Sequence, residues 1–165
     1  MEHQFTFYPV GNGDTSLLKL DNNKWILFDY YHQGQGEEDN SPVINLKQKL
    51  KDELTSNSRD YFDVVAFTHA DNDHIKGCSD FFEFDHADKY TGNGRIKIKE
   101  LWVPAAMILE TGLDGDDDRV IRQEARYRLK KGYGISVFSK PDELKKYLED
   151  NDLTIEDRRK FIVDA

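Results

Sequence analysis

Two histidines and two carboxylates occur within six consecutive positions, in the segment 69–74 (HADNDH). Imidazole nitrogens and carboxylate oxygens are the groups that bind zinc and other first-row divalent ions in proteins. One His beside one Asp is usually a hydrogen-bonded turn or a helix cap, so the density of the four side chains is the informative feature. We therefore interpret His69, Asp71, Asp73 and His74 as candidate metal ligands. Zn²⁺ is the expected ion and Mn²⁺ the alternative.

A calcium loop of the EF-hand type is excluded by spacing. The pair Asp71 and Asp73 begins like such a loop, but Ile75 and Lys76 stand where a ligand and the glycine are required. The acidic run 114–118 also lacks the glycine and the final glutamate. It is typical of the first turn of a helix, where carboxylates complement the helix dipole.

The elements around the candidate ligands favour a site at the edge of a sheet. Residues 61–68 are rich in β-formers and nearly all apolar, as in a strand buried on both faces. A short helix is expected over residues 74–82. Loops that follow strands in α/β sheets are where ligands bind, because side chains converge there without interrupting the core.

The rest of the pattern indicates an α/β fold in a single domain over residues 1–165. Strands are expected at 5–10, 16–20, 25–30, 98–103 and 135–138, with a helix opened by Ser41 and Pro42 and another over 116–131. Capping-box sequences at 139–142 and 154–157 open two terminal helices. Strands and helices alternate from residue 41, which predicts a sheet covered by helices.

Composition narrows the class of protein. The 165 residues include 23 Lys and Arg against 32 Asp and Glu, a net charge of −9. Such an acidic chain is poorly suited to capturing nucleic acid through phosphate contacts, although a substrate held through bound metal stays open. A single cysteine, Cys78, excludes an internal disulfide and a multi-cysteine zinc site. No apolar stretch approaches the ~20 residues of a membrane span, so a cytoplasmic location is expected.

Three motifs together carry a family resemblance. Residues 69–74, followed by Ile75-Lys76-Gly77, resemble the His-x-His-x-Asp-His metal motif of the metallo-β-lactamase superfamily. The aspartate at its second position is similar to the hydrolase domain of bacterial DNA-uptake competence proteins. Residues 10–18 (VGNGDTSLL) resemble the Gly-Asp hairpin of that group, and residues 26–29 (ILFD) resemble its strand that ends in aspartate. The resemblance covers about residues 4–80.

This resemblance implies a metallo-β-lactamase-like αββα sandwich and a hydrolase with two metal ions. His69 and Asp71 would bind one ion, and Asp73 and His74 the second, with Asp73 also the catalytic residue. Asp29 would orient the ligand loop from behind, and Asp14 would lie near the site or brace the preceding glycine turn. In the family, the ions activate a water that attacks a carbonyl or phosphoryl group.

The second half of the chain departs from the family pattern. The only histidine after His74 is His86, and no strand near the C-terminus ends in the Gly-Asp that would supply a bridging carboxylate. We therefore expect a truncated N-terminal half with one mixed sheet, flanking helices and an uncovered apolar face, inactive as an isolated chain. A missing C-terminal half, a further domain or a second copy would cover that face.

Two functions follow from these observations. The first is a metal-dependent hydrolase acting, when complete, on phosphodiesters of nucleic acids or nucleotides. The second is a catalytically incomplete module that binds a metal or serves as a partner-binding scaffold.

Overall fold

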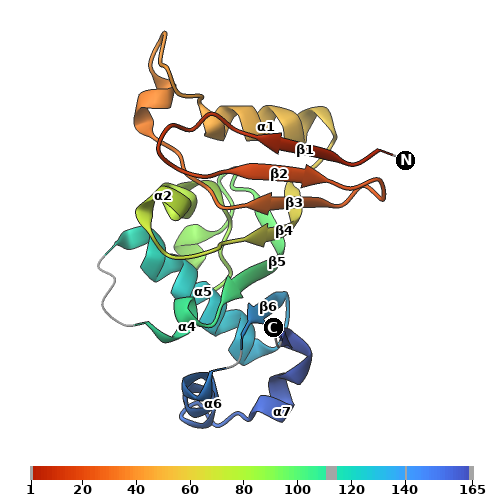
Figure 1. Ribbon diagram of the computed structural model, residues 1–165, viewed down its shortest axis with the longest axis vertical. Coiled ribbons are helices and arrows are strands. Elements are labelled where there is room, and N and C mark those ends of the chain that lie inside the picture. The colour runs from red at the N-terminus through yellow and green to blue at the C-terminus, as the bar shows by residue number, and fades with distance from the viewer. Residues whose placement is uncertain (1, 111–114, 140, 164–165) are drawn as a thin grey trace.

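One mixed sheet of seven strands forms the centre of the molecule (Figure 1). The computed structural model describes residues 2–110, 115–139 and 141–163. The strands lie in the sheet in sequence order: β1 (Gln4–Phe7), β2 (Ser16–Lys19), β3 (Trp25–Phe28), β4 (Tyr61–Ala66), β5 (Lys97–Pro104), β6 (Ile135–Phe138) and β7 (Ile162–Val163). The first three strands pair antiparallel, and β3 to β7 pair parallel. The predicted α/β class, with one mixed sheet and flanking helices, is confirmed.

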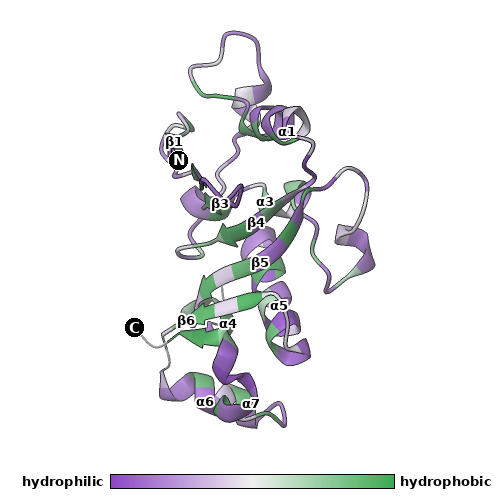
Figure 2. Ribbon diagram, turned by 90° about the vertical axis from the view of Figure 1, so that its right-hand side faces the viewer, coloured by the Kyte–Doolittle hydropathy of each residue, from purple (hydrophilic) through white to green (hydrophobic). Residues whose placement is uncertain are grey.

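The helices connect the parallel strands. They are α1 (Leu46–Ser56), α2 (Asn72–Ile75), α3 (Cys78–Phe81), α4 (Ala106–Leu109), α5 (Asp116–Lys131), α6 (Asp142–Glu149) and α7 (Ile155–Arg158), with 3₁₀ turns at Gly34–Glu37, Asp88–Tyr90 and Arg159–Phe161. Helices α1 and α5 cover one face of the sheet, whereas α6 and α7 lie beyond β6 (Figure 1, Figure 2). From β3 to β7, each strand lies next to the preceding one, always on the same side of it. Connections between parallel strands are right-handed, so the helices in them are expected on the same face of the sheet. Figure 2 shows α1 and α5 on the same side of the largely hydrophobic strands.

The core lies between the sheet and these helices. Leu27, Val65 and Leu101 of three adjacent strands are fully buried, together with Leu50 of α1 and Leu129 of α5. Within the three described segments, the structure contains no helix that is long and apolar enough to cross a membrane.

The opposite face of the sheet carries apolar side chains that remain partly exposed. Phe5 is 48% and Phe7 76% exposed, and Phe28, Trp102 and Phe138 are half-buried. Parallel sheets are ordinarily covered on both faces. This face therefore agrees with the expectation of an uncovered apolar surface.

Two predicted helices differ from the structure. The helix expected to open at Ser41 and Pro42 begins instead at Leu46, because Asn45 caps it by accepting a hydrogen bond from the Gln48 backbone N–H at 3.0 Å. The single helix expected over 74–82 is two short helices. Gly77, with φ +84°, takes up a left-handed conformation between them and ends α2.

The two predicted capping boxes had opposite outcomes. The box at Thr154 is confirmed: its hydroxyl accepts from the Asp157 N–H, and the Asp157 carboxylate accepts from the Thr154 N–H. The box over 139–142 is wrong, although its residue 140 lies outside the described residues. Helix α6 begins at Asp142 with Pro141 at its N-cap and no side-chain cap. Ser139 belongs to the sheet edge, where its N–H donates to the Val163 carbonyl.

Candidate metal centre

The site lies where two adjacent parallel strands end. Phe28 of β3 is paired with Ala66 of β4. Asp29 comes directly after β3 and Thr68 two residues after β4, so both lie at the ends of neighbouring strands. The backbone after β3 is hydrogen-bonded to α2: the Tyr30 N–H donates to the His74 carbonyl at 2.8 Å. These backbone bonds bring His74, at the end of a four-residue helix, back over the strand ends.

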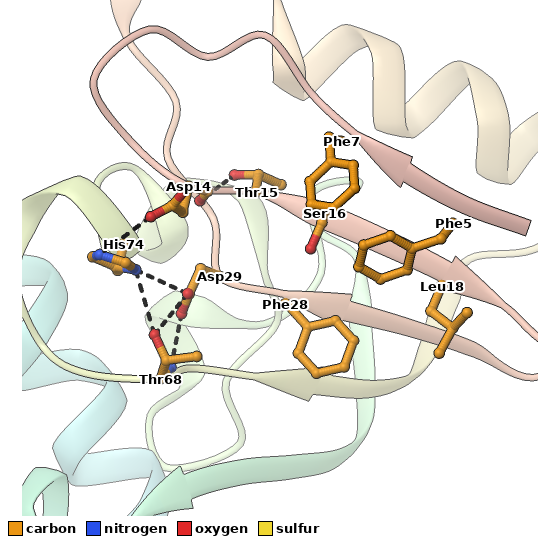
Figure 3. Close-up of a pocket in the computed structure, with 10 residues that line it drawn as sticks. All are labelled: Phe5, Phe7, Asp14, Thr15, Ser16, Leu18, Phe28, Asp29, Thr68 and His74. Atoms are coloured by element: carbon orange, nitrogen blue, oxygen red, sulfur yellow. Dashed lines mark hydrogen bonds and ion pairs between the residues drawn. The ribbon is translucent and has the colours of Figure 1, made fainter.

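The Asp29 carboxylate connects the segment after β3 with the ligand loop. Its Oδ1 accepts from the Thr68 N–H at 2.7 Å, and its Oδ2 accepts from the Thr68 hydroxyl at 2.7 Å and lies 2.9 Å from His74 Nδ1 (Figure 3). Asp29 is 4% exposed and has a φ of 53°, a left-handed conformation that aspartate tolerates better than most residues. The structure thus brings Asp29 within hydrogen-bonding reach of both Thr68 and His74.

These contacts determine the tautomers of the two histidines. An ionised carboxylate only accepts, so in a neutral His74 the proton lies on Nδ1 and the lone pair on Nε2. The Thr68 hydroxyl donates its one proton to Asp29, and its oxygen then accepts from His69 Nδ1 at 3.1 Å. In a neutral His69 the lone pair therefore lies on Nε2 as well. A neutral imidazole with a free Nε2 and a hydrogen-bonded Nδ1 is the form that binds metal ions.

Three candidate ligands lie close together beside the hydrogen bonds of Asp29 and Thr68. One ligand atom each of His69, Asp73 and His74 lies within 4.8 Å of the other two. His74 Nε2 is 3.5 Å from Asp73 Oδ2 and 3.6 Å from Asp14 Oδ2. Two ligands bound tetrahedrally at the usual zinc distances lie about 3.3 Å apart. The observed separations are therefore close to those of atoms that share one ion.

The grouping differs from the two pairs that the resemblance implies. His69, Asp73 and His74 form one group, and Asp71 stands beside it, with its Oδ2 3.6 Å from His69 Nε2 and its side chain 72% exposed. The Asp14 side chain is 76% exposed, close to His74. Asp14 and Asp71 are thus the carboxylates nearest to the group that could supply a further ligand.

Gly13 allows the β1–β2 connection to approach α2. The neighbouring Asp14 N–H donates to the Asp73 carbonyl at 3.0 Å. A Cβ at position 13 would lie 2.1 Å from the Tyr31 ring and 2.7 Å from the Asp73 carbonyl oxygen. Only glycine fits there without displacing one of these groups, so this turn helps to position the ligand-bearing helix.

Sequence reasoning missed two residues that position the site. The first is Thr68, whose hydroxyl links Asp29 to His69. The second is Asp117 of α5, whose carboxylate accepts from the Gly77 and Ser79 N–H groups at 2.8 and 2.9 Å and so fixes the turn after α2. Asp117 stands in the acidic run explained by the helix dipole, and nothing in that run shows that it contacts residues about 40 positions earlier.

Cys78, the single cysteine, is a packed residue. Its side chain is fully buried, with Sγ 3.5 Å from Asp117 Oδ1. Burial, assisted by the negative charge of Asp117, raises the pKa of the thiol well above its usual range. A thiolate nucleophile at this position is therefore disfavoured at neutral pH.

His86 is paired with Glu124 and not with the candidate metal ligands. Its Nδ1 lies 3.0 Å from Glu124 Oε2, and Glu124 also binds Arg128 at 2.5 Å. Burial acts to raise the pKa of Glu124, but the hydrogen bonds from His86 and the charge of Arg128 outweigh it and lower that pKa. His86 thus belongs to a buried polar cluster and not to the group of candidate ligands His69, Asp73 and His74.

Comparison with protein-family models, with curated proteins and with solved structures finds no match.

Proposed function

We propose that this protein binds a divalent metal through His69, Asp73 and His74, with Zn²⁺ as the favoured ion and Mn²⁺ as the alternative. The observation that carries the proposal is the Asp29–Thr68 arrangement, which in neutral imidazoles holds the protons on both Nδ1 atoms, together with the approach of His74 Nε2 to the Asp73 carboxylate at 3.5 Å. Two imidazoles and a carboxylate form a donor set common in catalytic zinc sites.

We further propose that the site belongs to a metallohydrolase of the metallo-β-lactamase type. A metal bound here would polarise a substrate carbonyl or phosphoryl group and lower the pKa of a bound water. His69 and His74 would hold the ion, and Asp29 would keep His74 in the required tautomer. Asp73, 51% exposed, and the nearby Asp14 leave carboxylate oxygens at the open side, where they can accept a proton from water. Phosphodiesters are the substrates that the resemblance implies.

The finer fold assignment is part of the same proposal. Seven strands with helices on one face correspond to one half of an αββα sandwich. The apolar face over β4–β6, lined by Ala66, Trp102, Pro104 and Phe138, would be covered by a second half, a further domain or another copy. This assignment is supported by the uncovered face and by the position of the candidate ligands at the strand ends.

A second candidate function is a metal- or partner-binding scaffold without turnover. It is favoured by the origin of the ligands, because His69, Asp73 and His74 all come from one loop and the short helix after it. Two-metal hydrolysis requires ligands on both sides of the substrate. Turnover by the isolated chain is the quantity that separates the two functions.

The test is a metal titration against a chromophoric chelator, followed by hydrolysis assays with bis(p-nitrophenyl) phosphate and p-nitrophenyl acetate. We expect binding of one equivalent of Zn²⁺, lost in His69→Ala and retained in His3→Ala, which changes an exposed histidine at the other end of β1. Absence of binding, or equal loss in both variants, would contradict the metal site. Metal-dependent hydrolysis would support the metallohydrolase over the scaffold.

A further inference from the structure

A groove of about 470 Å³ runs from the metal group along the open face of β1–β3 (Figure 3). Its polar end is formed by Asp14, Asp29, Thr68 and His74, and its other end by Phe5, Phe7, Leu18 and Phe28, with Thr15 and Ser16 between them. This volume lies within the range of small-molecule sites, which are mostly apolar with a few polar groups at one end. The groove thus reaches the candidate ligands at His74, the one of the three that lines it.

The pairing register of the strands explains the apolar end. Phe5 of β1 is opposite Leu18 of β2, and Ser16 of β2 is opposite both Phe7 and Phe28. Paired residues share a face of a sheet, so these side chains stand on the same side. The rings of Phe5 and Phe7 meet edge to face with centroids 4.7 Å apart, and Phe5 and Phe28 are 6.4 Å apart.

The charges of the groove discriminate between classes of ligand. None of the described residues that line it is Lys or Arg, and its ionisable groups are Asp14, Asp29 and His74. A polynucleotide needs cations for its phosphates. Here each phosphate beyond the one at the metal would meet carboxylates or aromatic rings, on a chain with a net charge of −9. An uncharged apolar group is not repelled by these carboxylates.

We infer that the groove binds an uncharged aryl or acyl group, and that the substrates of the site are hydrophobic carboxylic esters. This inference rests on the proposed function for its reactive end and puts carboxylic esters in place of the phosphodiesters that the resemblance implies. Hydrolysis of such an ester adds the water oxygen to the carbonyl carbon and breaks the carbon–oxygen bond. The products are a carboxylic acid and an alcohol, and no further reactant is required.

The test compares two metal-binding ligands on the zinc-loaded protein by calorimetry. Acetohydroxamate reports binding to the ion alone, and phenylacetohydroxamate adds a ring that can enter the groove. We expect the phenyl compound to bind about 10- to 50-fold more tightly, from burial of about 60–90 Å² of ring surface at the usual free energy per unit of apolar area.

Variants of the groove residues distinguish binding of the ring from binding to the ion. Phe7→Ala and Phe28→Ala should each lower that affinity ratio at least threefold, as the ring loses a wall of the groove, and leave acetohydroxamate binding unchanged. Val163→Ala, which changes an exposed apolar residue on the distant edge strand β7, should leave the ratio as it is. A ratio near one, or a ratio insensitive to both groove variants, would overturn the inference. Displacement of the phenyl compound by the dinucleotide pTpT would also overturn it.

A metal-free measurement distinguishes failure of the groove from failure of the proposed function. Phenylacetamide, which has no metal-binding group, should shift the backbone amide resonances of Phe5, Phe7, Leu18 and Phe28 in the apo-protein. Such shifts without any zinc binding would support the groove and contradict the metal site. Zinc and hydroxamate binding without these shifts would support the metal site and overturn the groove.

Discussion

Replacement of Asp29 by asparagine tests whether its contacts with Thr68 and His74 position the candidate metal ligands. The carboxylate accepts from the Thr68 N–H and the Thr68 hydroxyl, and it pairs with His74 Nδ1. Asparagine has nearly the same shape but only one acceptor oxygen. If that oxygen stays with the Thr68 N–H, the amide nitrogen faces the Thr68 hydroxyl and His74. If the amide is turned round, the Thr68 N–H loses its acceptor.

The size of the effect follows from these contacts. Hydrogen bonds to a charged group are worth about 1.5–3 kcal/mol each, so Asp29→Asn should lower the free energy of unfolding of the metal-free protein by about 2–3 kcal/mol. Loss of the group that orients a metal-binding histidine typically costs 10- to 100-fold in metal affinity. That loss corresponds to about 1.4–2.7 kcal/mol of binding free energy.

The assay is competition for Zn²⁺ with a chromophoric chelator, on variants shown to be folded by circular dichroism. Asp63→Asn is the matched control, because Asp63 accepts from the Trp25 N–H and pairs with Arg59 within the same sheet. It lies five residues before Thr68, about 16 Å along the strand. This control should lose stability and keep its zinc affinity. Unchanged zinc affinity in Asp29→Asn, or an equal loss in Asp63→Asn, would refute the supporting role of Asp29.

Four further predictions concern the surroundings of the site. Gly13→Ala should cost about 1–3 kcal/mol of stability and weaken zinc binding, because the added methyl displaces the Tyr31 ring or the backbone of α2; chemical denaturation and the chelator assay measure both. Asp71→His should raise the ratio of zinc to manganese affinity, since imidazole suits zinc better than a carboxylate does; an unchanged ratio in calorimetry would show that Asp71 is not a ligand. Cys78, whose pKa is raised by burial, should react with a disulfide reagent at pH 8 only after denaturation, and fast labelling of the native protein would contradict its packing role. Light scattering should detect concentration-dependent self-association through the uncovered sheet face, reduced in Trp102→Ser, whereas a monomer at high concentration would count against it.

The sequence predicted that the candidate ligands lie in a loop at a strand end, but not the contacts within that loop. The apolar strand followed by four candidate ligands was sufficient to predict a loop at a strand end, because strand-forming runs and polar loops are local properties. The contacts of Asp29 with Thr68 join residues 39 positions apart, and those of Asp117 with Gly77 join residues 40 positions apart. Neither separation leaves a periodic signal. The two ligand pairs came from the family resemblance, and the grouping of His69, Asp73 and His74 depends on how α2 turns back over the strands.

Helix boundaries show the same limit. Ser41-Pro42 and Asn45 are both sound helix starts by residue type, and the hydrogen bond from the Gln48 N–H to Asn45 decides between them only in the folded chain. Gly77 was visible in the sequence, but its left-handed conformation depends on the packing of the segment after α2 against His32 and on the Asp117 carboxylate.

We propose that one ion is held by Nε2 of His69, Nε2 of His74 and a carboxylate oxygen of Asp73. The most direct measurement is an anomalous difference map at the zinc edge from crystals grown or soaked with Zn²⁺. We expect one peak within about 2.0–2.2 Å of His69 Nε2, His74 Nε2 and an Asp73 carboxylate oxygen, with His74 Nδ1 still paired to Asp29. A peak only at His3 or His86, or no peak at saturating zinc, would contradict the account.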